Sequence, residues 1–86
     1  MKNGLFIDDC GTKWWYKDDK IHRDNDLHAA EDFDGKYWYQ YGELHRLNGP
    51  AVEYEDGIIH WHYEGKCILA SSQEEFDRYI KLLAFI

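Results

Sequence analysis

The chain has 86 residues, carries 17 acidic against 10 basic side chains, and has a formal net charge of −7. Its length allows one domain with a modest core, because a small chain buries a limited share of its surface. The acidic balance argues against a protein that grips nucleic-acid phosphates, which requires a basic face, and the first nine residues hold only a three-residue apolar run, too short for a signal peptide or a membrane span.

Short runs with strand character follow one another from residue 5 to residue 69. Aromatic residues make up 17% of the chain and favour strands. Residues 51–55 and 59–63 alternate between apolar and polar side chains, so that one face packs and the other is wet. We therefore expect an antiparallel meander. The expected strands lie at residues 5–7, 13–17, 20–23, 28–33, 36–41, 43–46, 51–55, 58–63 and 66–69.

Glycine beside an acid or another turn former separates these runs. Asp34-Gly35 and Asp56-Gly57 predict two-residue hairpins, because a type I′ turn needs positive φ at both central positions. Gly42 and Gly65 occupy equivalent turn positions in later parts of the chain, and Asp19 stands in the same place earlier.

The periodicity changes after residue 70. Ser72 and Glu75 form a Ser-x-x-Glu capping box, and Phe76, Tyr79 and Ile80 then fall on one helical face. The sequence predicts a helix over about residues 72–85 that covers the apolar face or the open end of the sheet.

Three tryptophans, Trp15, Trp38 and Trp61, are spaced by 23 residues, and the sequence around them repeats with them. Such a period indicates one small supersecondary unit stacked on itself, each copy too small to bury its own apolar face. We expect these tryptophans, with Tyr39 and Tyr63, to form the repeated core of a single domain over residues 1–86, with the sheet at about 5–69. The first copy aligns with the second only if it carries one extra residue near Leu27-His28, which implies a bulge or a longer loop there.

The middle copy reads Trp-Tyr-x-x-Gly-x-Leu-His-Arg-x-x-Gly-Pro-Ala-Val over residues 38–52. This pattern resembles a repeat common in small bacteriophage proteins, which is itself similar to the variant MORN repeats (membrane occupation and recognition nexus) that form hairpins stacked into an elongated sheet. The phage proteins also tend to end in a Ser-x-Glu-Glu-Phe helix, as residues 72–76 do. The resemblance covers about residues 11–80. The first copy lacks Gly-Pro and the third stops after Cys67-Ile68. The resemblance implies the fold and a phage source; most of these phage proteins have no assigned activity, so it indicates no mechanism.

Acidic clusters are the main candidates for a functional surface. Catalytic carboxylates need a dry pocket that raises one pKa, which a small sheet with acids at its turns does not offer. Acids along one edge or face would instead imitate a nucleic-acid backbone and occupy a basic groove on another protein; the alternative is that they form turns and keep the chain soluble. The candidate partner-binding residues are Asp18, Asp19, Asp24, Asp26, Glu31, Asp32, Asp34, Glu55 and Asp56.

Histidines offer two further interpretations. His60 and His62 share one strand face and, with Cys67, form an alternative metal-binding set, although their spacing matches no established zinc pattern, so neither a metal nor a cofactor is predicted. In the repeated pairs His22-Arg23 and His45-Arg46, the imidazole is expected to pack against the Trp-Tyr ladder and the arginine to point at a neighbouring carboxylate, with a paired anion site as the alternative.

These observations favour a protein that acts by binding and has no catalytic activity. The expected function is that of a phage-type inhibitor of a host defence or nucleic-acid-handling protein with a basic surface, active in the cytoplasm of an infected bacterium, with no direct contact to nucleic acid or membrane. The alternative is a structural module that self-associates through its apolar tail at residues 82–86 or through an open sheet edge. A monomer and a homodimer are both compatible with the sequence.

Overall fold

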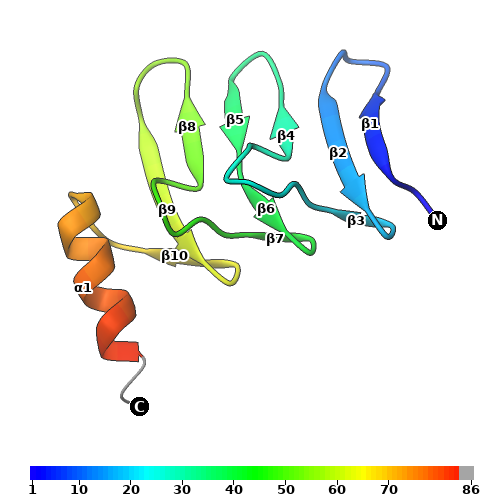
Figure 1. Cartoon of the computed structure of the whole chain (residues 1–86). Coiled ribbons are helices and arrows are strands. Elements are labelled where there is room, and N and C mark those ends of the chain that lie inside the picture. The colour runs from blue at the N-terminus through cyan, green and yellow to red at the C-terminus, as the bar shows by residue number, and fades with distance from the viewer. Residues whose placement is uncertain (84–86) are drawn as a thin grey trace.

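The computed structural model describes residues 1–83 as a row of antiparallel hairpins with one helix at the C-terminal end (Figure 1). This arrangement confirms the predicted fold class, mainly β with a single C-terminal helix. The helix α1 spans Gln73–Leu83. The strands are β1 (Gly4–Ile7), β2 (Lys13–Lys17), β3 (Lys20–Ile21), β4 (Ala30–Glu31), β5 (Gly35–Tyr37), β6 (Tyr39–Gln40), β7 (Glu43–Leu44), β8 (Val52–Tyr54), β9 (Ile59–Tyr63) and β10 (Lys66–Ile68).

The main sheet has the order β1-β2-β4-β5-β8-β9-β10, with β3 pairing to β2, while β6 and β7 form a separate pair. Two kinds of connection lie on opposite edges in Figure 1. The loops β1–β2, β4–β5 and β8–β9 (residues 8–12, 32–34 and 55–58) form what we call the tip edge. The turns β2–β3, β6–β7 and β9–β10 (residues 18–19, 41–42 and 64–65) form the turn edge.

Backbone hydrogen bonds repeat with the sequence. The Trp15 amide donates to Ala29 O and the Trp38 amide to Ala51 O, each over 2.8 Å. The guanidinium groups repeat as well: that of Arg23 donates to His28 O and that of Arg46 to Pro50 O. The two arginines are 23 positions apart in the chain, but their two acceptors are only 22 apart. The predicted extra residue near Leu27-His28 is thereby confirmed.

The tight turns differ from the prediction. Type I′ geometry, with positive φ at both central residues, occurs on the turn edge: φ is 49° and 88° at Tyr41-Gly42, and 48° and 85° at Glu64-Gly65. Asp18-Asp19 has the same geometry, so the equivalence of Asp19 with the two glycines is confirmed. The prediction of a type I′ turn at Asp34-Gly35 is wrong, because neither residue has positive φ. A Cβ on Gly35 would lie 2.5 Å from Glu53 O, so this glycine serves the close approach of β5 to β8.

Asp56-Gly57 is a turn, but not of the predicted type. Only Gly57 has positive φ, at 94°. The Gly57 amide donates to Tyr54 O and the Tyr54 amide to Ile58 O, so the loop closes with a single left-handed residue.

Burial is strongest where one copy covers the next. Trp38 and Trp61 are both 6% exposed, while Trp15, Tyr39 and Tyr63 are half-buried. Trp38 and Trp61 thus meet the expectation of a repeated core, and Trp15, near the open end of the sheet, meets it only in part.

The helix closes the C-terminal end of the sheet. Phe76 is fully buried and packs with Trp61 and Ile68, with Ile80 beside them. Ser72 Oγ accepts a bond from the Glu75 amide, as the capping box predicts, but the Glu75 carboxylate bonds to Ser71 Oγ. The predicted helix positions 84–85, and the end of the predicted apolar tail, lie outside the described residues.

Candidate functional site

The nine acids predicted as one surface are divided by the fold among separate places. Asp18 and Asp19 lie on the turn edge, Asp24 and Asp26 lie in the corner loop after β3, and Glu31 lies on β4. Asp32, Asp34, Glu55 and Asp56 come together on the tip edge, which Figure 1 shows at the far side of the sheet from the turns.

The corner acids are engaged in joining parts of the fold. Asp24 contacts His22 Nε2 at 2.7 Å and Lys17 Nζ at 3.1 Å, and these bonds hold the pKa of its carboxyl below the ordinary value. Asp26 receives two bonds from Arg46, of 2.9 and 3.2 Å, and its carbonyl accepts the Trp38 indole N–H. A carboxylate held this way is less available to a partner.

Glu31 and Asp32 are also used internally. Glu31 lies 2.7 Å from His28 Nε2. Asp32 Oδ1 accepts from the amides of Asp34 and Gly35, each at 2.9 Å, and from the Tyr37 hydroxyl. Burial and this bond raise the pKa of Tyr37 well above its ordinary value. Asp32 therefore builds the β4–β5 loop.

Phe33, Asp34, Tyr54, Glu55, Asp56 and Ile58 line a shallow hollow on the tip edge, which we call the tip hollow. Phe33 is 95% exposed and Ile58 53% exposed. The Glu55 amide donates to Asp34 O over 2.8 Å, so neighbouring hairpin loops are tied together.

The charges of the tip hollow are all negative. Within residues 1–83, Asp34, Glu55 and Asp56 make no ion pair, and no described lysine or arginine lines the hollow. Asp56 Oδ1 accepts only the nearby Ile58 amide. Exposed apolar side chains beside uncompensated carboxylates are suited to a partner that brings both apolar and basic groups.

The first hairpin extends the acidic row of the tip edge to the β1–β2 loop. Asp8 accepts from the amides of Cys10 and Thr12 and from the Trp14 indole N–H. The Trp14 bond is the main cause of the lowered pKa of Asp8. This carboxylate stays ionised while it holds its loop.

Sequence reasoning missed the apolar members of the tip hollow. The sequence places Phe33, Tyr54 and Ile58 in the expected strands 28–33, 51–55 and 58–63, because aromatic and β-branched side chains favour strands. One signal was present: Phe33 stands between Asp32 and Asp34, where burial is difficult.

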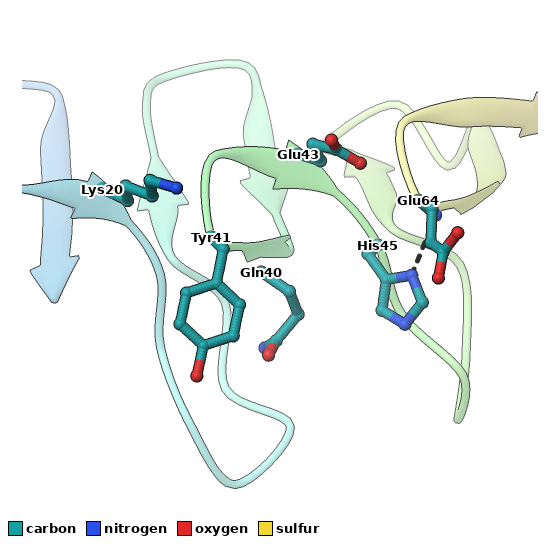
Figure 2. A pocket seen from close by; sticks show the side chains of 6 residues that line it. All are labelled: Lys20, Gln40, Tyr41, Glu43, His45 and Glu64. Carbon is teal, nitrogen blue, oxygen red and sulfur yellow. Dashed lines mark hydrogen bonds between the residues drawn. The ribbon is translucent and has the colours of Figure 1, made fainter. Parts of the chain in front are cut away.

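The turn edge carries a second, larger groove, shown in Figure 2, lined by Lys20, Gln40, Tyr41, Glu43, His45 and Glu64. His45 Nδ1 accepts the Glu64 amide over 2.9 Å, the dashed contact in Figure 2. His22 Nδ1 accepts the Tyr41 amide in the same way, over 3.0 Å. Each histidine thereby locks the turn of the following copy, which gives these side chains a structural role.

The repeated imidazoles pack against tyrosines, His22 against Tyr41 and His45 against Tyr63. The expected carboxylate partner is found for Arg46 but, within residues 1–83, not for Arg23, which donates to His28 O. Both arginines lie instead over tryptophan rings. The guanidinium carbon of Arg23 lies 4.2 Å from the Trp15 ring centroid, and that of Arg46 lies 3.8 Å from that of Trp38. Arg46 also contacts Glu53 over 2.9 Å, so its charge is directed at carboxylates of the fold.

The predicted alternative metal residues do not converge. His60 is exposed and contacts the Tyr54 ring edge to face, whereas His62 is half-buried on the same strand. Burial is the main cause of the lowered pKa of His62. Cys67 is exposed, opposite His62 in the β9–β10 register. Among residues 1–83, no group of three or more His, Cys, Asp or Glu side chains is placed to hold a metal ion.

No protein-family model, curated protein or solved structure matches this chain. Over the described part of the chain, no helix combines the length and the apolar character that crossing a bilayer requires.

Proposed function

We propose that this chain is a non-catalytic protein-binding module whose tip hollow takes a segment of a partner protein bearing apolar and basic side chains. One observation carries this proposal: the fully exposed Phe33 lies among three carboxylates that no described residue pairs. Burial of an exposed phenylalanine contributes about 1.5–3 kcal/mol, and unpaired carboxylates steer a basic partner.

In this fold, the residues that join the copies are separate from the exposed residues of the tip hollow. Polar groups of the turn edge and the corner loop form hydrogen bonds between successive copies, as those of His22, His45 and Asp26 do. The tip loops bond largely within themselves and with each other, so a tip side chain can contact a partner without loosening the sheet.

A narrower form of the proposal names the partner. The resemblance to phage repeat proteins and the net charge of −7 favour a phage-type inhibitor that occupies the basic, nucleic-acid-binding surface of a host defence or replication protein. Such an inhibitor works in the cytoplasm of the infected bacterium. It imitates the charge of nucleic acid and does not itself bind nucleic acid.

The test uses two charge reversals of equal size. Asp34→Lys with Glu55→Lys changes the tip hollow, and Asp18→Lys with Glu64→Lys makes the same change of net charge on the turn edge. None of these four side chains makes a hydrogen bond or an ion pair within residues 1–83. The partner is captured from an extract of a bacterial host and then titrated against each variant.

The tip reversal should weaken binding at least tenfold, while the turn-edge reversal should leave the affinity within about twofold. The association rate of the unaltered protein should fall as salt rises. Equal losses in both variants would show that net charge alone drives the encounter, and an unaffected tip variant would refute the assignment of the hollow.

A further inference from the structure

The β1 strand leaves one edge of the sheet open. β1 pairs only with β2 in the described part of the chain, and Leu5, Phe6 and Ile7 are all exposed. The opposite end is covered by α1 (Figure 1). Proline and charged side chains usually protect an edge strand from pairing. Gly4–Ile7 contains neither.

The free backbone groups of this edge follow from the register. Leu5 lies opposite Trp15, and the Trp15 amide and carbonyl both bond on the far side of β2, to Ala29 and His22. Leu5 and Trp15 are therefore a non-hydrogen-bonded pair, and the N–H and C=O of Leu5 point away from β2. By alternation the same holds for Ile7.

We propose that a second copy of this chain pairs with β1 in the antiparallel sense, with Leu5 on the two-fold axis. The outward N–H and C=O of Leu5 then bond to Leu5 of the second copy. This proposal uses a surface different from the tip hollow.

Side-chain chemistry favours a second copy as the occupant. Antiparallel pairing about Leu5 brings the Lys2 end of one strand to the Asp8 end of the other, so residues of opposite charge lie at both ends of the pair. Phe6 faces Gly4 of the second copy, and a large ring over a strand glycine covers backbone that the glycine leaves bare. Lys2 Nζ lies 5.1 Å from the Phe6 ring centroid, so the two side chains lie on the same face of the sheet.

The geometry of the pair has a consequence for binding. Antiparallel pairing in one sheet requires a two-fold axis perpendicular to that sheet, so the tip edges of the two copies lie along opposite edges of the combined sheet. Each dimer then presents two separate tip hollows.

The experiment measures molar mass by light scattering after size exclusion for four proteins. The unaltered chain and the control Leu69→Glu, an exposed position far from β1, should both have twice the mass of one chain. Leu5→Glu and Leu5→Lys should each be monomeric, because like charges face each other across the axis. Their equimolar mixture should again be dimeric.

A second variant covers the case in which a charge at position 5 disturbs folding. Leu5→Cys, in a background with Cys10→Ser and Cys67→Ser, should form a disulfide between two copies, because the Cα atoms of a hydrogen-bonded antiparallel pair lie about 5.5 Å apart. A monomeric unaltered chain at its highest soluble concentration would overturn the proposal. So would a mixture of charge variants that stays monomeric, or a Leu5→Cys chain that does not cross-link.

Discussion

The polar side chains of the turn edge bond to the neighbouring copy, whereas those of the tip edge bond within their own loops. On the turn edge, the amides of Tyr41 and Glu64 are bonded by His22 and His45 of the preceding copy, and the amides of Gly42 and Gly65 bond to carbonyls of that copy. On the tip edge, Asp8 and Asp32 bond to amides of their own loops. The turn edge holds the copies together, and the tip edge leaves side chains free.

This difference shows how a small repeat sheet can expose apolar and acidic side chains on one edge without loosening its core. Each copy is too small to be stable alone, so its polar groups on one edge are committed to its neighbour. The other edge needs only short turns closed by local bonds. Exposed apolar and acidic side chains there cost the fold little, and they are available to a partner.

The largest expected effect on stability is at the turn edge. His22 is 3% exposed, and its two ring nitrogens contact the Tyr41 amide and Asp24. His22→Leu should reduce the free energy of unfolding by about 2–3 kcal/mol, because it leaves the part-buried Tyr41 amide without its acceptor and removes one of the two partners of Asp24. Denaturant titration measures this change, and a loss below about 0.5 kcal/mol would show that the histidine does not join the copies.

The matching change at the tip edge should affect binding and not stability. Phe33→Ala should alter the free energy of unfolding by less than about 0.5 kcal/mol, because the ring is exposed, yet it should weaken partner binding about tenfold or more. Denaturant titration and isothermal titration calorimetry separate the two effects. A large loss of stability would mean that Phe33 belongs to the core.

A smaller, stabilising effect is expected from the strained turn residues. Glu64 adopts a φ of 48°, and asparagine tolerates this region better than glutamate. Glu64→Asn should raise the free energy of unfolding by about 0.5 kcal/mol. The control Glu55→Asn on the tip edge, where φ is negative, should not raise it, and equal gains at both sites would contradict the assignment of strain to the turn edge.

The smallest effect concerns pH. The pKa values of His28 and His62 are lowered, mainly because burial disfavours the charged imidazolium. The folded state therefore binds fewer protons than the unfolded chain, and stability should fall as pH drops through the ordinary histidine value of about 6.5 towards the lower folded pKa.

The acids act at lower pH. The lowered pKa of Asp8 keeps the β1–β2 loop intact until pH falls below the ordinary aspartate range. Unfolding midpoints measured against pH should show the histidine step first, and His62→Gln should flatten it. An unchanged profile in that variant would contradict the role of His62.

The sequence predicted the fold class because its signals are local and repeated: the tryptophan spacing, the alternation along residues 59–63, and the cap at Ser72. It failed at Asp34-Gly35, where the dipeptide favours a type I′ turn but the approach of Glu53 decides the conformation. That approach depends on a strand 18 positions away, and short-range patterns do not contain it.

The candidate site was predicted only in part for a related reason. Composition identified the acids, but which of them remain unpaired depends on distant partners, such as Arg46 for Asp26, 20 residues apart. Phe33 is the last residue of the expected strand 28–33, but β4 ends at Glu31 and the ring is exposed between two loop acids. Only the tertiary arrangement separates the free acids of the tip hollow from those that hold the copies together.

Amide hydrogen exchange of the protein with and without its captured partner tests the central claim most directly. The account predicts new protection at residues 33–34 and 55–58 of the tip hollow, with exchange at the turn-edge amides of Tyr41, Gly42, Glu64 and Gly65 unchanged. Protection centred on the turn edge, with exchange in the tip hollow the same in the complex as in the free protein, would contradict it.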